Sequence, residues 1–185
     1  MATDRRTLLA DSALDVLVDD GMRGLTHRAV DRKSALPPGT TSAYFRTRAA
    51  LLSGLVNRLV ELDQAELQAT AEAFPALRTA EELVDGMVLL ARQRLTGAGR
   101  RRSLARLSCT VESVRDPELR AILVPRENAG REAVRQFLAV QGVKDVESRT
   151  DTLLTCIDGL IFDALVHGTE VRRDALDGLV IAALR

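Results

Sequence analysis

Apolar residues recur along this chain at the spacing of an α-helix, and no stretch sustains the apolar–polar alternation of a half-buried strand. In the first segment, Leu9 and Val16 fall on one face of a helix expected over residues 5–20. Gly21 follows this segment and is a natural left-handed stop. The pattern therefore predicts an all-α protein.

Capping signals and helix breakers divide the pattern into about nine helices. Thr79 and Glu82 have the spacing of a capping box, and Pro125 should kink or break the helix that contains it. The predicted helices begin near residues 5, 26, 38, 48, 79, 100, 116, 145 and 171. We assign residues 1–50 to a three-helix helix-turn-helix DNA-binding domain and residues 51–185 to a helical ligand-binding and dimerisation bundle.

The stretch from Leu25 to Leu52 contains two short helices joined by a tight turn, which is the helix-turn-helix arrangement. Its first helix would be capped by Thr26, and its second would open at Pro38, whose ring presets φ for the first helical position. The stretch carries a local excess of positive charge over the single acidic residue Asp31. The basic residues are Arg28, Arg32, Lys33, Arg46 and Arg48. Because the whole chain is balanced at 26 basic and 26 acidic residues, the excess is a local feature that favours phosphate binding.

Residues 5 to 52 resemble the N-terminal domain of the tetracycline-repressor (TetR) family of bacterial transcription regulators. The matching segments are ALDVLVDDG, GLTHRAV, LPPGTTSAYF and RTRAALL. Two places depart from the family pattern. Pro37 and Pro38 replace a small polar residue and a lysine, and Ser42 with Ala43 replaces an aromatic pair. The resemblance implies a homodimeric repressor that a small-molecule effector releases from a palindromic operator.

The resemblance and the flanking positions together identify the predicted DNA-binding residues. Small hydroxyl side chains in the second helix are candidates for base edges, and residues on either side of it are candidates for phosphates. The base-edge candidates are Thr40, Thr41 and Ser42. The phosphate candidates are Thr26, His27, Arg28, Tyr44 and Arg48. Pro38 and Gly39, at the start of the second helix, complete the predicted site.

The segment from 145 to 167 is apolar over more than one helical face, so it needs a second burial partner. The last helix, together with the same two helices of a second subunit, would provide that partner as a four-helix interface. Asp158 and Asp163 interrupt the apolar surface and are expected at its rim. The predicted dimer contacts are Leu153, Ile157, Leu160, Ile161, Ala164, Leu165, Leu176, Leu179 and Val180.

An effector pocket is expected beside the break at Pro125, among the helices that begin near 79, 100 and 116. The helix from 48 to 72 would link this pocket to the DNA-binding domain. The candidate pocket residues are Met87, Cys109, Thr110, Glu112 and Phe137. For Cys109 with Thr110 and Glu112, and for Met87 and Phe137, the sequence favours burial in an ordinary core over a place in a cavity.

Composition narrows the function further. The chain has 46% hydrophobic and 28% charged residues, no apolar run near the length of a membrane span, and no secretory-type leader, so we expect a cytoplasmic protein. Cys109 and Cys156 lack metal-ligand spacing and are expected as buried thiols. The sequence offers no nucleophile–base pair, phosphate loop or cofactor motif, which argues against an enzyme. The alternative function is a helical dimeric adaptor or ligand-binding protein whose DNA binding is weakened or lost.

Overall fold

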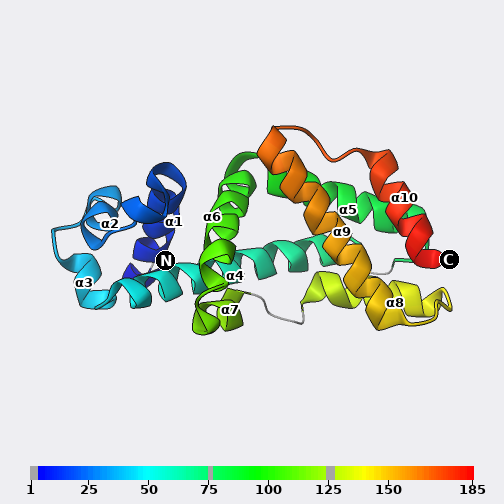
Figure 1. Cartoon of the computed structure of the whole chain (residues 1–185), viewed down its shortest axis with the longest axis horizontal. Helices are drawn as coiled ribbons and strands as arrows, with labels where there is room; N and C mark the ends of the chain where they lie inside the picture. Colours follow the sequence, from blue (N-terminus) through cyan, green and yellow to red (C-terminus); the bar gives the residue numbers. More distant parts are fainter. Residues whose placement is uncertain (1–3, 75–76, 124–127) are drawn as a thin grey trace. The chain divides into compact units, whose positions relative to one another are not determined.

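The computed structural model describes residues 4–74, 77–123 and 128–185, and within these ranges it contains ten α-helices and no strand (Figure 1). The predicted all-α class is confirmed. The helices are α1 (Arg5–Gly24), α2 (His27–Lys33), α3 (Thr40–Tyr44), α4 (Arg48–Ala73), α5 (Ala80–Leu95), α6 (Gly97–Ser113), α7 (Pro117–Leu123), α8 (Ala129–Val140), α9 (Val146–His167) and α10 (Arg173–Leu184).

The tenth helix arises because the segment expected as one helix from 116 to 142 forms α7 and α8. Each has its own start signal. The Asp116 side chain accepts a hydrogen bond from the Leu119 backbone at 3.0 Å, and the Asn128 side chain accepts one from the Arg131 backbone at 2.9 Å. Pro125, to which the break was assigned, lies outside the described residues.

The chain divides into two compact units. The N-terminal unit comprises residues 1–63 and 101–125, and the C-terminal unit comprises residues 64–100 and 126–185. These limits differ from the boundary at residues 50 and 51 that the sequence suggested, because part of α4 and most of α6 and α7 pack with the first three helices. The assignment of DNA binding to residues 1–50, and of ligand binding and dimerisation to 51–185, stays a prediction.

Apolar burial holds the N-terminal unit together. A domain of roughly 50 residues buries too little surface to be stable alone, and α4, α6 and α7 supply the missing core. Leu55 of α4, Cys109 of α6 and Leu123 of α7 are all fully buried in one cluster with the apolar face of α1. Each buried leucine contributes about 1.5–3 kcal/mol relative to exposure, so these contacts dominate the packing of α6 and α7.

Ion pairs join α6 to α1 and α2 at the edge of this core. One guanidinium nitrogen of Arg101 lies 2.8 Å from Asp15 and 3.0 Å from Asp19, and Asp19 also accepts a hydrogen bond from Lys33 at 2.9 Å. Hydrogen bonds from Lys33 and then Arg101 lower the pKa of Asp19. Because all four side chains are exposed, such pairs add only about 0.2–1 kcal/mol each. They orient α6 and α2 more than they stabilise them.

The C-terminal unit buries a second core among α5, α8, α9 and α10. The predicted capping box begins α5: the Thr79 hydroxyl accepts from the Glu82 backbone at 3.2 Å, and the Glu82 carboxylate accepts from the Thr79 backbone at 3.1 Å. Gly168 ends α9 in the left-handed conformation, where the sequence placed the end of that helix. Asp158 and Asp163 are exposed, as expected of rim positions.

The residues predicted to form a dimer interface are mostly buried inside the C-terminal unit itself, and the interface stays a prediction. Seven of them are buried, namely Leu153, Ile157, Ile161, Ala164, Leu165, Leu176 and Val180. Leu160 and Leu179 pack against the same core. The reason is that α9 packs on α5, α8 and α10 at once, so its apolar positions serve the unit's own core.

Other apolar side chains of α9 and α10 face outward. Phe162 is 49% exposed, Val166 is 57% exposed and Ile181 is 49% exposed. Gly159 and Gly178 stand beside open space, with no atom within 4 Å of where a Cβ would lie. We call Gly159, Phe162, Val166, Gly178 and Ile181 the outer stripe.

Candidate nucleic-acid interface

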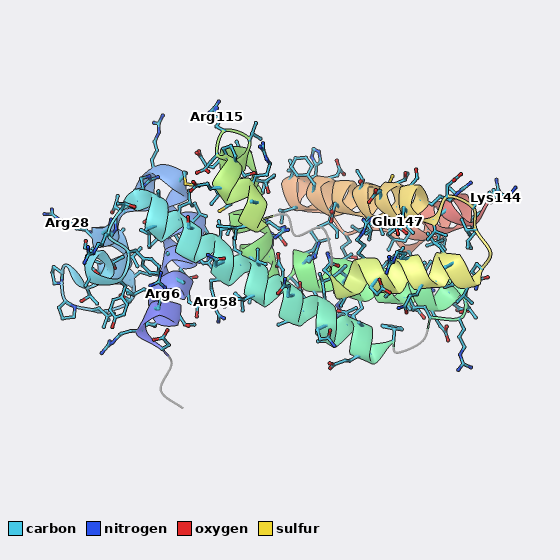
Figure 2. All side chains as sticks on the ribbon, turned by 90° about the horizontal axis from the view of Figure 1, so that it is seen from below. Arg6, Arg28, Arg58, Arg115, Lys144 and Glu147 are labelled. Atoms are coloured by element: carbon cyan, nitrogen blue, oxygen red, sulfur yellow. The ribbon has the colours of Figure 1, made fainter. Side chains whose placement is uncertain are left out.

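The first helix of the helix-turn-helix begins as the sequence predicts. Thr26 is the residue that caps α2, and its hydroxyl accepts a hydrogen bond from the Ala29 backbone at 3.2 Å. Ala29 and Val30 are buried against α1, whereas Arg28 and Arg32 are exposed. Figure 2 shows Arg28 projecting outward from α2. The helix therefore anchors itself by one face and leaves cations on the other.

A defined turn precedes α3, and the helix starts later than predicted. The Thr40 backbone donates to the Pro37 carbonyl at 3.1 Å, and Gly39 has φ 92° and ψ −8°. These are the features of a type II turn with Pro38 and Gly39 at its centre, where the positive φ requires glycine. Helix α3 therefore begins at Thr40 and not at Pro38, and Pro38 presets the turn instead of the helix.

Asp31 of α2 supplies the cap that Gly39, having no side chain, cannot give to α3. Its two carboxylate oxygens accept hydrogen bonds from the Gly39 backbone at 2.8 Å, the Thr41 backbone at 2.7 Å and the Thr41 hydroxyl at 2.6 Å. Burial of Asp31 acts to raise its pKa, but these hydrogen bonds outweigh burial and hold the pKa below the ordinary value of 3.8. One ionised side chain therefore fixes α3 to α2.

The same contacts correct the role predicted for Thr41. Its side chain is 0% exposed, and its hydroxyl proton is committed to Asp31. Thr41 therefore positions α3 and cannot reach a base edge while α3 is folded. The sequence analysis treats Asp31 only as the single acidic residue of a basic stretch. Its isolation there, ten residues before Thr41, is the signal that could have indicated this contact.

The exposed face of α3 consists of Ser42, Ala43 and Tyr44. Tyr44 is 40% exposed. Thr40 is partly exposed, but its hydroxyl donates to the Pro37 carbonyl at 2.7 Å, so it is committed to the turn. Ser42 is the predicted base-edge residue that remains open. Ala43, which the sequence did not single out, adds a methyl group to the same face.

Phe45 fixes the far end of α3. Its ring is buried, the Arg6 guanidinium lies 4.7 Å from the ring centroid, and a Cβ added to Gly54 would stand 2.3 Å from a ring carbon. The Phe45 carbonyl accepts a hydrogen bond from Nε2 of His27 at 2.6 Å. Glycine at position 54 thus lets α4 approach the ring, and His27 ties the start of α2 to the end of α3.

Arg48, predicted to bind phosphate, has a structural contact as well. Its guanidinium donates to the Met22 carbonyl at 2.6 Å and to the Leu25 carbonyl. It therefore ties the start of α4 to the segment that leads into α2. Thr47 caps α4 as predicted, accepting from the Ala50 backbone at 3.0 Å. Arg28 and Arg46 are exposed cations on opposite sides of α3 in the sequence.

The five predicted pocket residues do not come together in one compact unit. Met87 and Phe137 are buried in the C-terminal core, and Cys109 is buried in the N-terminal core. Thr110 is exposed and Glu112 is partly exposed on α6. Burial raises the pKa of the Cys109 thiol to about 12, so the thiol stays protonated and unreactive near neutral pH. Met87, Cys109 and Phe137 are core residues, as the sequence favoured over a place in a cavity.

The described residues contain neither a metal-binding cluster nor a membrane-spanning helix. No group of three or more His, Cys, Asp or Glu side chains within them could hold a metal ion. None of the helices in the described ranges has the length and apolar character that crossing a membrane needs.

Comparison with known proteins places the chain among helical regulators. The family model for the tetracycline repressor-like C-terminal domain matches residues 78–185. A member of the TetR family from Streptomyces coelicolor A3 has 22% sequence identity, covers 99% of this chain and 99% of its own, and superposes with a TM-score of 0.75. A transcriptional regulator from Rhodococcus sp. Rha1 also has 22% identity, with 97% of this chain and 94% of its own covered and a TM-score of 0.75.

A third solved structure is the multidrug binding protein EbrR complexed with ethidium. It has 20% identity, covers 99% of each chain, and superposes with a TM-score of 0.73. At such identities the likeness establishes a shared fold. No curated protein matches the sequence significantly.

Replacing Asp31 by asparagine tests the central contact of the helix-turn-helix. The amide keeps one acceptor oxygen but presents an N–H₂ group toward one of the donors, so we expect the free energy of unfolding to fall by roughly 2–4 kcal/mol. Thermal and urea denaturation followed by circular dichroism measure the change. Asp20→Asn, at an exposed aspartate of α1, is the matched control and should change stability by less than about 0.5 kcal/mol.

The pH dependence of the free energy of unfolding tests whether the ionised Asp31 carboxylate makes this contact. Because the pKa of Asp31 is lowered in the folded state, its stabilisation is present above the ordinary value of 3.8 and is lost as pH falls below it. The wild-type protein should therefore lose more stability between about pH 5 and pH 2 than Asp31→Asn does. Parallel pH profiles for the two proteins would contradict the role given to the carboxylate.

Proposed function

The chain belongs to the tetracycline-repressor family of transcriptional regulators, and we propose that it binds operator DNA through α2 and α3. The observation that carries the proposal is the short, exposed face of α3, held at one end by Asp31 and at the other by Phe45 and His27. A helix of this kind fits the major groove, where base edges present distinct donors and acceptors. Ser42 would read a base edge, and the Ala43 methyl would contact a thymine methyl.

Cations around α3 would bind the phosphates. Arg28 and Arg46 are exposed, and the remaining N–H groups of the Arg48 guanidinium are available beside its carbonyl contacts. Thr26, Tyr44 and the turn residues Pro38 and Gly39 stay in the proposed contact surface because all four are exposed. Phosphate contacts of this type set the register on the duplex without reading its sequence.

The adaptor alternative, with weakened or lost DNA binding, is suggested by Pro37 and Pro38, which replace a small polar residue and a lysine of the family pattern. That turn removes a residue that would cap α3, but the Asp31 carboxylate provides the cap instead. Helix α3 is thus ordered for recognition despite its unusual start. This favours DNA binding over the adaptor.

We also propose a homodimer formed by the outer stripe of α9 and α10. A two-fold interface places the same patch of each subunit against its copy, and small residues let helix backbones approach closely. The outer stripe has both features, since Phe162, Val166 and Ile181 offer apolar surface and Gly159 and Gly178 offer room. A dimer presents two recognition helices, as a palindromic operator requires.

We further propose that a small-molecule effector controls DNA binding. EbrR, which shares the fold, is a multidrug binding protein whose structure was solved with ethidium. By analogy, the region matched by the C-terminal family model would bind a small molecule that lowers operator affinity and relieves repression. Such coupling is reciprocal, so the operator must weaken effector binding by the same factor, typically about five- to 150-fold.

Selection of bound sequences from a random duplex pool tests the function directly. We expect an inverted repeat whose half-sites lie roughly one helical turn apart or somewhat more. Binding should weaken steeply as salt rises, because phosphate contacts release counterions. A pool that returns no enriched sequence, with binding absent at low salt, would favour the adaptor instead.

Two substitutions separate phosphate contacts from base reading. Arg28→Ala should weaken binding to all duplexes alike and reduce the slope of log affinity against log salt by about one per subunit. Ser42→Ala should instead change preference at particular base pairs by roughly 1 kcal/mol or more. Competition binding with single-base variants of the selected site measures both effects. Altered base preference in Arg28→Ala, with none in Ser42→Ala, would reverse the two roles.

Phe162→Asp tests the dimer. Because each two-fold interface contains the substitution twice, two carboxylates would be buried together, and we expect dimer affinity to fall at least tenfold. Sedimentation equilibrium measures the dissociation constant. Val140→Asp is the control, since Val140 is an apolar residue of α8 that is 78% exposed and lies outside the outer stripe. Equal effects of the two substitutions would contradict the assignment of the interface.

A further inference from the structure

The hydrogen bond between His27 and Phe45 determines which ring nitrogen carries the proton. A carbonyl oxygen can only accept, so Nε2 of His27, 2.6 Å from the Phe45 carbonyl oxygen, must be the N–H donor. A neutral imidazole carries one proton. When His27 is neutral, its Nδ1 therefore has a lone pair and no hydrogen.

This tautomer decides what His27 can do beside DNA. Phosphate oxygens are acceptors, so a neutral His27 would present a lone pair to a phosphate and repel it. The imidazolium form has N–H groups at both nitrogens. It alone can keep the bond to the Phe45 carbonyl and donate a charge-assisted hydrogen bond to a phosphate from Nδ1.

The charged groups around the ring act in both directions. Asp31, on the same helix, attracts the imidazolium. Arg28 is the next residue, Arg46 follows Phe45, and Arg48 of α4 holds the Leu25 carbonyl two residues before His27. A DNA phosphate bound beside Nδ1 adds a negative charge, which favours the imidazolium in the complex.

We propose that operator binding takes up protons at His27, at most one per subunit, so that DNA affinity rises as pH falls through the range where imidazoles titrate. On binding, each His27 that is neutral in the free protein gains one proton from solvent, and its Nδ1–H then donates to a phosphate oxygen. The inference rests on the proposed DNA-binding function. It makes His27 a proton-dependent phosphate contact, in addition to its tie between α2 and α3.

The composition of the chain makes the proposal open to a clean test. The sequence has two histidines, and the other, His167, lies at the end of α9 with Nε2 3.5 Å from Asp163. Histidine is the side chain whose ordinary charge change falls between about pH 5 and 8. Removing the two in turn therefore assigns a pH effect to the N-terminal or to the C-terminal unit.

The experiment measures affinity for the selected operator at pH 6 and pH 8, at constant ionic strength, by fluorescence anisotropy. For the wild-type protein we expect binding to be about fivefold tighter per subunit at pH 6, or roughly 25-fold for a dimer. His27→Gln should remove this difference, because an amide can donate to the Phe45 carbonyl but cannot gain a proton. His167→Gln is the control and should keep it.

Two further readouts do not depend on how well His27→Gln folds. Calorimetric titration of the wild-type protein with operator at pH 7, in two buffers of different ionisation enthalpy, counts the protons taken up, and we expect between one and two per dimer. The salt dependence should also be steeper at pH 6 than at pH 8, by up to about 0.9 per subunit, since a phosphate contact is added.

The results distinguish a failure of the role of His27 from a failure of the proposed DNA binding. Operator binding that is tight, with no proton uptake and equal affinity at both pH values, overturns the role of His27 and leaves DNA binding intact. A pH effect that persists in His27→Gln and disappears in His167→Gln also overturns it. If the wild-type protein selects no duplex at either pH, the proposed function itself fails.

Discussion

The helix-turn-helix depends on one buried carboxylate. Asp31 accepts three hydrogen bonds from Gly39 and Thr41, and it thereby supplies the N-terminal cap of α3 across the turn. Helix α3 has five residues, too few for its own hydrogen bonds to hold it. Its orientation is therefore a property of its two ends, with Asp31 at one and Phe45 at the other. The contacts of Asp31 and Phe45 therefore also position the exposed side chains of α3.

The sequence predicted the regular parts of the fold well. Helical spacing, the caps at Thr26, Thr47 and Thr79, and the glycine stop at Gly168 follow from interactions within a few residues. Contacts between residues far apart in the sequence could not be predicted from spacing and capping signals. The bond from Thr41 to Asp31 crosses a turn, and the start of α3 moved because Pro38 and Gly39 satisfy a type II turn before any helix can begin.

The sequence also did not predict which apolar side chains of a helix are buried within its own chain. A helix such as α9 has apolar residues on several faces, and spacing alone does not say which face meets the same chain. The residues proposed for a dimer from sequence, such as Ile157 and Val180, lie in the core, while Phe162 and Ile181 remain outside. The same limit applies to the candidate pocket. Met87, Phe137 and Cys109 are apolar enough to line a cavity, and equally suited to the cores that bury them.

If the outer stripe forms the proposed dimer, the amount of protein in the cell becomes a control variable. A subunit that must pair before it can span two half-sites occupies its operator in proportion to the square of the monomer concentration, as long as monomers are in excess. Halving synthesis would then cut occupancy about fourfold at low levels. Dosage of the regulator would thus sharpen the switch without any effector, through nothing more than the exposed phenylalanine, valine and isoleucine of α9 and α10.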